Sequence, residues 1–137
     1  MKMLTTTVAR VLFAVPFAVS GLFHFTNARA MAGVVPVPGG VFWVYFTGLA
    51  LLAGSLGLVT KRLGQWAALG LALLMLTFVA TIHVPHLADP EMAQMAMSGL
   101  LKDLGLSGGA LTWAGILASE PRGQAIPRAA LAEQPAR

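Results

Sequence analysis

Ionisable and polar residues of this 137-residue chain gather near the ends of its apolar runs, and its three histidines stand among them. His83 and His86 are three positions apart, a spacing at which two side chains of a helix are neighbours. Lys102 and Asp103 stand side by side in the last apolar run. Imidazole, ammonium and carboxylate groups beside apolar walls could bind the head group of a quinone-like molecule. We predict four ligand-binding residues: His24, His83, Lys102 and Asp103.

A charged side chain at membrane depth is costly and is usually paired, so Lys102 and Asp103 need partners. Because consecutive residues of a helix point in different directions, we do not expect these two to pair with each other. The histidines, Arg29 and Glu91 are the candidate partners. In an alternative interpretation these groups are only interfacial: Lys102 extends toward the membrane surface, and the histidines hydrogen-bond the ends of helices.

A copper site is a further alternative. Thioethers are soft ligands that suit Cu(I), and three methionines follow the paired histidines in the sequence. Methionine also fills gaps in apolar packing, however, and His-x-x-His by itself is a weak pattern. The sequence therefore favours no metal. The speculative copper ligands are His83, His86, Met92 and Met95, with His24 and Met97 as further candidates.

Other kinds of chemistry are excluded by the sequence. It contains no phosphate-binding glycine loop and no nucleophile elbow. The chain has no cysteine, which excludes thiolate chemistry. The formal net charge is +4, but the basic residues form no stripe, so we do not expect a nucleic-acid partner. A non-catalytic subunit is a better prediction than an enzyme.

Four apolar runs must position these side chains. They cover roughly residues 6–25, 41–59, 64–84 and 98–118, and each is close to the ~20 residues that a membrane-spanning helix needs. The chain is 57% hydrophobic and 10% charged, whereas soluble domains have about 25% charged residues. We therefore predict an all-α integral membrane protein, with a four-helix bundle over residues 1–118 surrounded by a lipid bilayer. A flexible cytoplasmic tail is expected over 119–137.

The basic residues predict the orientation of this bundle. Seven of the nine lysines and arginines fall on one side if the spans are those above, and the positive-inside rule makes that side cytoplasmic. Both termini are then cytoplasmic, in a multi-pass protein of a bacterial-type cytoplasmic (inner) membrane. In the alternative, the first run is a secretory signal cleaved near Ser20, although its continuation to Phe25 is better suited to a span.

Small residues recur at four-residue spacing in the second and fourth runs. In lipid, this pattern lets two helix backbones approach closely. We expect the contacts to lie mainly within the bundle, and we also expect a protein partner or a homo-oligomer. The predicted helix-packing residues are Ala50, Gly54, Gly57, Gly105 and Gly109.

Three stretches resemble a known family: SGLFHF at 20–25, TGLALLAG at 47–54 and LKDLGLSGGAL at 101–111. On these, the chain resembles the DoxX family of small four-span membrane proteins over about residues 5–118. The resemblance implies a four-helix bundle in the cytoplasmic membrane. Some members are subunits of a thiosulfate:quinone oxidoreductase, and others associate with redox or stress-protection partners. Members often carry a glutamate in the second span where this chain has Leu51, so an acidic role at that position does not transfer.

These observations predict an accessory or interaction subunit. The components of a redox assembly are its candidate partners. Two alternatives stay open. One is a quinone-linked membrane oxidoreductase component with an outward-facing site, for which a quinone would be the cofactor. The other is an outward-face copper-binding protein.

Overall fold

The computed structural model describes residues 4–35, 38–60 and 63–120, and these are mostly helical, with short turns between the helices. These ranges contain no strand, which confirms the all-α prediction. A π-helical turn η1 (Leu4–Val8) leads into α1 (Ala9–Thr26), and the short α2 (Ala28–Ala32) follows. The remaining elements are α3 (Gly40–Val59), α4 (Gly64–Phe78) continuing through η2 (Val79–His83) into α5 (Val84–His86), and α6 (Ala93–Ser119).

Three helical segments are long and apolar enough to cross a membrane: Thr5–Thr26, Gly40–Val59 and Gly64–His86. Many of their leucines, valines and phenylalanines are exposed, as expected for helices that face lipid. The third segment continues past the expected end at residue 84 because Pro85 occupies the first turn of α5, where a proline needs no backbone donor. Helix α6 is longer but less apolar, because glycines, serines and a Lys–Asp pair interrupt it. Its role as a fourth span stays a prediction.

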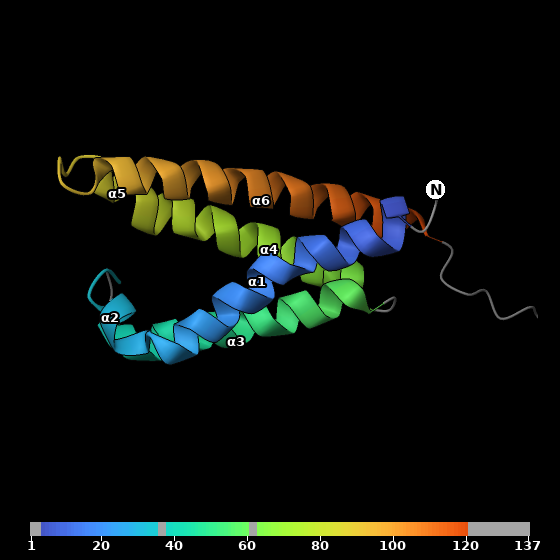
Figure 1. The fold of residues 1–137 in the computed structure, drawn as a ribbon, viewed down its shortest axis with the longest axis horizontal. Coiled ribbons are helices and arrows are strands. Elements are labelled where there is room, and N and C mark those ends of the chain that lie inside the picture. Colours follow the sequence, from blue (N-terminus) through green and yellow to red (C-terminus); the bar gives the residue numbers. More distant parts are fainter. Residues whose placement is uncertain (1–3, 36–37, 61–62, 121–137) are drawn as a thin grey trace, which may run out of the picture.

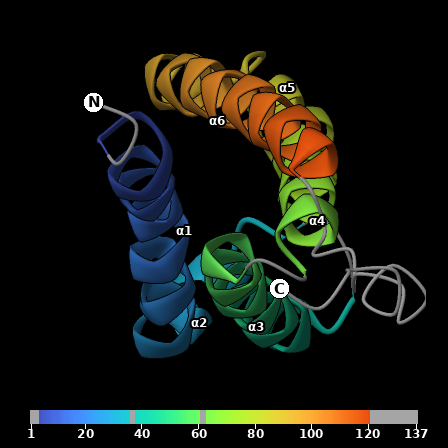
Figure 2. The same ribbon diagram turned by 90° about the vertical axis from the view of Figure 1, so that its right-hand side faces the viewer.

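The four long helices are neighbours in the order α1, α3, α4, α6. Seen from one end, they form an arc in that order (Figure 2). Figure 1 shows that the α1–α3 and α4–α6 pairs lie close together at one end of the molecule and diverge toward α2 and α5. At the ends of the arc, α1 and α6 have few close contacts within the described residues, and one of these contacts is the ring of Phe13 against Gly109. The arrangement is therefore open between its two helix pairs.

Two predicted packing residues lie where α3 meets α4. A Cβ added at Gly54 would stand 2.6 Å from the side chain of Leu71, and one added at Gly57 would stand 2.6 Å from Ala67. Glycine is needed at both positions because any side chain would push the helices apart. The buried core lies beside these contacts and draws on all four long helices, with Phe17, Leu51, Leu58, Leu71 and Trp113 among its large members.

Two other predicted packing residues, Gly105 and Ala50, do not lie in the close contact between α3 and α4. Gly105 lies on the outer face of α6 with no atom within 4 Å of an added Cβ, so it packs against no other helix of the described residues. Four-residue spacing does not say which face of a helix is covered, so a packing role for Gly105 stays a prediction. Ala50 is half-buried beside an outer groove between α3 and α4. The closest crossing of α1 and α3 instead uses Gly21 and Gly48, which come from different runs.

One sequence prediction concerns residues outside the described part of the chain. Nearly all of the predicted tail at 119–137 lies there. The domain boundaries and the sides on which the termini lie stay predictions.

Candidate functional site

A cavity of about 560 Å³ lies between the two helix pairs, where they diverge. Its walls come from α1, α3, α4 with η2, and α6. Met31 of α2 and residues 34 and 35 after α2 also border it. Most of the lining is apolar, including Phe17, Leu51, Leu74 and Phe78. The few polar groups therefore set what the cavity can recognise.

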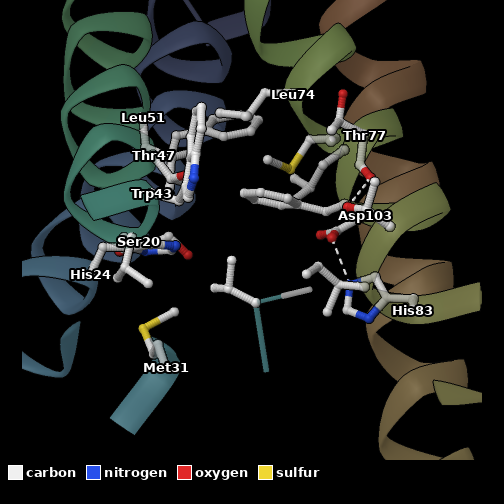
Figure 3. A pocket seen from close by; sticks show the side chains of 18 of the residues that line it. Ser20, His24, Met31, Trp43, Thr47, Leu51, Leu74, Thr77, His83 and Asp103 are labelled. Atoms are coloured by element: carbon white, nitrogen blue, oxygen red, sulfur yellow. Dashed lines mark hydrogen bonds and ion pairs between the residues drawn. The ribbon is translucent and has the colours of Figure 1, made fainter. Parts of the chain in front are cut away.

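These polar groups stand on two opposite walls (Figure 3). Ser20, His24, Trp43 and Thr47 lie on the α1–α3 side, and Thr77, His83 and Asp103 lie on the α4–α6 side. Lys102 also borders the cavity. All four predicted ligand-binding residues thus line one space, although His24 is on the wall opposite the other three.

Asp103 is the deepest charged group at this cavity. Its side chain is only 2% exposed, and it lies ten residues beyond Ala93, which is about 15 Å along the axis of α6. Its Oδ2 is 2.9 Å from Nε2 of His83. The expected histidine partner of Asp103 is therefore His83, whereas Arg29 and Glu91 are both exposed. A charge at this depth has to be compensated, and the imidazole supplies part of the compensation.

The position of His83 depends on the backbone of two helices. His83 ends the π-helical η2, and π turns often occur at functional sites because they change the direction of the side chains that follow. The His83 ring lies directly against Gly99 of α6, and any Cβ there would overlap it. A single sequence gives no signal for Gly99, since its importance depends on a residue sixteen positions away on another helix.

The expectation that Lys102 and Asp103 would not pair is wrong. Nζ of Lys102 lies 3.2 Å from Oδ1 of Asp103. The two residues do point in different directions, but the four-carbon stem of lysine is long enough to bend round to its neighbour. The Lys102 side chain is 60% exposed, so it reaches the carboxylate from the outside of the bundle. Oδ1 itself is buried and has no hydrogen-bond partner within the described residues.

The other two histidines bond to their own helices. Nδ1 of His24 is 2.7 Å from the carbonyl oxygen of Ser20, and its ring stacks near Phe78 with the ring centroids 6.5 Å apart. Nδ1 of His86 is 2.6 Å from the carbonyl oxygen of Ile82. The bond of His86 to the backbone of its own helix agrees with the interfacial interpretation, in which the histidines hydrogen-bond the ends of helices. It does not describe His83, whose partner is a buried carboxylate.

The copper site predicted at His83, His86, Met92 and Met95 finds no added support from this geometry. Nε2 of His83 is engaged by Asp103, and Met95 is largely exposed. Within residues 4–35, 38–60 and 63–120, no three histidine, aspartate or glutamate side chains are placed to hold a metal ion. The copper site stays a prediction.

A family model for DoxX matches residues 5–84, which is more than half of the chain. The matched range runs from η1 to the start of α5. No curated protein and no solved structure matches the chain. The resemblance expected over residues 5–118 is thus supported only as far as Val84. Helix α6, which provides Lys102 and Asp103 to the cavity, lies outside the matched range.

Proposed function

The chain belongs to the DoxX family of membrane proteins, and from that premise we propose that it binds a quinone-type ligand in the cavity between its helix pairs, as a component of a membrane redox assembly. The observation that carries this proposal is the contact of the buried Asp103 with the partly buried His83 on the wall of a mostly apolar cavity. An ionisable residue buried in a membrane protein is costly, and such residues commonly mark a functional site.

The cavity has the properties of a small-molecule site. Its volume of about 560 Å³ falls within the range of roughly 300–1,000 Å³ typical of ligand pockets. Such pockets combine apolar walls with a few polar groups that orient the ligand. Here the apolar side chains would contact the ring and tail, and the polar groups on the opposite walls would contact the oxygen atoms of the head group.

The proposal includes α6 as a fourth span, with both termini on the cytoplasmic side of the bacterial inner membrane. Two features support it. Helix α6 has 27 residues, about 40 Å, which is enough to cross a hydrocarbon core. It also packs along α4, which is one of the three candidate spans. The lysine and arginine distribution supports the orientation.

Ligand titration tests the proposal. The purified chain is titrated with a short-tail benzoquinone while its tryptophan fluorescence is followed, to which Trp43 of the cavity lining contributes. We expect saturable quenching that is lost in Asp103→Ala. Leu106→Phe should also weaken binding, because it narrows the cavity without adding or removing a polar group. The control is Glu91→Gln, an exposed residue outside the cavity lining. Absence of saturable binding to the folded wild-type chain would contradict the proposal.

A non-catalytic interaction subunit is the second candidate, and the outer face of α6 favours it. Gly105, Gly108 and Gly115 have no atom within 4 Å of an added Cβ, so this face is open to another helix. Purification in mild detergent should then yield a defined oligomer or a stoichiometric partner, which Gly105→Leu with Gly108→Leu should dissociate. Gly70→Leu makes the same change on α4 and serves as the control. A partnerless monomer would argue against this role.

A further inference from the structure

Several hydrogen-bond donors on the cavity wall are already used by the protein. The indole nitrogen of Trp43 donates to the carbonyl oxygen of Pro38 at 3.2 Å. The hydroxyl of Thr77 donates to the carbonyl of Leu73 at 2.9 Å, and that of Thr81 donates to the carbonyl of Thr77 at 2.7 Å. Each of these groups has a single proton to give. The two hydroxyls therefore keep only lone pairs for a ligand, and the indole keeps nothing.

His24, on the α1 wall of the cavity, likewise offers a ligand a hydrogen-bond acceptor. Nδ1 of His24 faces the carbonyl oxygen of Ser20, which can only accept a hydrogen bond, so Nδ1 must carry the proton. In a neutral imidazole the other nitrogen, Nε2, is then unprotonated. His24 can offer this nitrogen to a ligand as an acceptor.

The opposite wall carries the strongest acceptor. A carboxylate has no proton to donate, and Oδ2 of Asp103 already accepts from Nε2 of His83. Oδ1 is buried, and within the described residues it has the ion pair with Lys102 at 3.2 Å but no hydrogen bond, so it can accept one from a ligand donor. Lys102 offsets the charge of Oδ1 from the exposed side. The hydroxyls of Ser20 and Thr47 can either donate or accept, so they do not oppose this preference.

We propose that the cavity binds the reduced, dihydroxy form of its ligand, a hydroquinone, more tightly than the oxidised quinone. This inference rests on the proposed function. The two oxygens of a quinone can only accept hydrogen bonds, and they would face the acceptors of Asp103 and His24. The two hydroxyls of a hydroquinone can donate, one to Oδ1 of Asp103 and the other toward Nε2 of His24. The acceptor-rich walls thus discriminate between two molecules of almost the same shape.

The test compares the two forms of one molecule on the full chain. A short-tail benzoquinone and its hydroquinone are titrated separately under anaerobic conditions at the same pH. We expect the hydroquinone to bind roughly tenfold more tightly, the effect of one hydrogen bond to a buried charged acceptor. Equal affinities, or tighter binding of the quinone, would overturn the inference and leave the proposed function standing. If neither form binds, the proposed function fails and the inference fails with it.

Asp103→Asn then assigns the preference to one residue. The amide of asparagine can donate a hydrogen bond, so the affinity ratio between the two forms should fall toward one. Glu91→Gln makes the same acid-to-amide change at an exposed position and should leave the ratio unchanged. A folded Asp103→Asn variant that keeps the wild-type ratio would refute the role given to Asp103. If this variant does not fold, the wild-type ratio still decides the main inference.

Discussion

Nε2 of His83 and Oδ2 of Asp103 are 2.9 Å apart, although the two residues are separated by twenty positions and lie on different helices. Their contact joins the end of the α4 segment to α6 beside the cavity. A second polar contact joins the same helices further along, where the hydroxyl of Ser107 donates to the carbonyl of Ala72 at 3.3 Å. The α4–α6 pair is therefore held by polar interactions as well as by apolar packing.

Removing His83 should destabilise the protein because it leaves a buried carboxylate without its imidazole partner. We expect His83→Ala to lower the free energy of unfolding by about 3 kcal/mol. The double variant with Asp103→Ala should lose less than the sum of the two single changes. Unfolding by denaturing detergent, followed by circular dichroism, measures these values. His86→Ala is the control, because among the described residues the His86 ring bonds to the backbone of its own helix, and it should cost no more than about 1 kcal/mol. Additive losses would show that the pair is not coupled.

Gly99→Ala should displace His83 from Asp103. The added methyl group would overlap the imidazole ring, so the variant should lose both stability and ligand affinity. Gly108→Ala, on the same helix, has open space around the new Cβ. It should be neutral or stabilising by about 0.5–1 kcal/mol, the usual gain of alanine over glycine within a helix. Thermal unfolding and quinone titration of the two variants distinguish them, and equal behaviour would contradict the packing of His83 on Gly99.

Gly48→Ala should separate α1 from α3 at the position of His24. The new Cβ would stand 2.8 Å from Cβ of His24 and 3.1 Å from the carbonyl oxygen of Gly21, which is backbone and cannot turn aside. We expect lower thermal stability and weaker ligand binding. Gly70→Ala, which has open space on α4, is the matched control. A Gly48→Ala variant as stable as this control would mean that the helices do not cross so closely.

Cysteine labelling tests whether α6 is a fourth span. Because the chain has no cysteine, single cysteines can be introduced without first removing native ones. Ala88→Cys lies before α6, Ser119→Cys at its end and Thr60→Cys after α3, and all three positions are exposed. A membrane-impermeant maleimide applied to whole cells should label Ala88→Cys and leave the other two unlabelled until the cells are opened. Labelling of Ala88→Cys and Ser119→Cys from the same side would contradict a spanning α6.

The helices and the membrane environment could be predicted because they depend on local properties. An apolar run of about twenty residues is helical in lipid whatever its neighbours are, since its backbone groups must bond within the segment. Three of the four predicted runs are candidate spans, and the DoxX resemblance is supported over residues 5–84. The four predicted ligand-binding residues, which all line the cavity, could be selected because ionisable groups are scarce in such runs. Their pairing could not be predicted, as the contact of Lys102 with Asp103 shows.

The sequence by itself determined that this protein is helical, that it belongs in a membrane and which few side chains can do chemistry there. Only the tertiary structure decided that Asp103 is buried beside a cavity, that His83 is its partner and that Gly99 makes room for the ring. The physical reason is that hydropathy is a property of each segment alone. The face that a helix turns toward its neighbour depends instead on how side chains from several segments fit together.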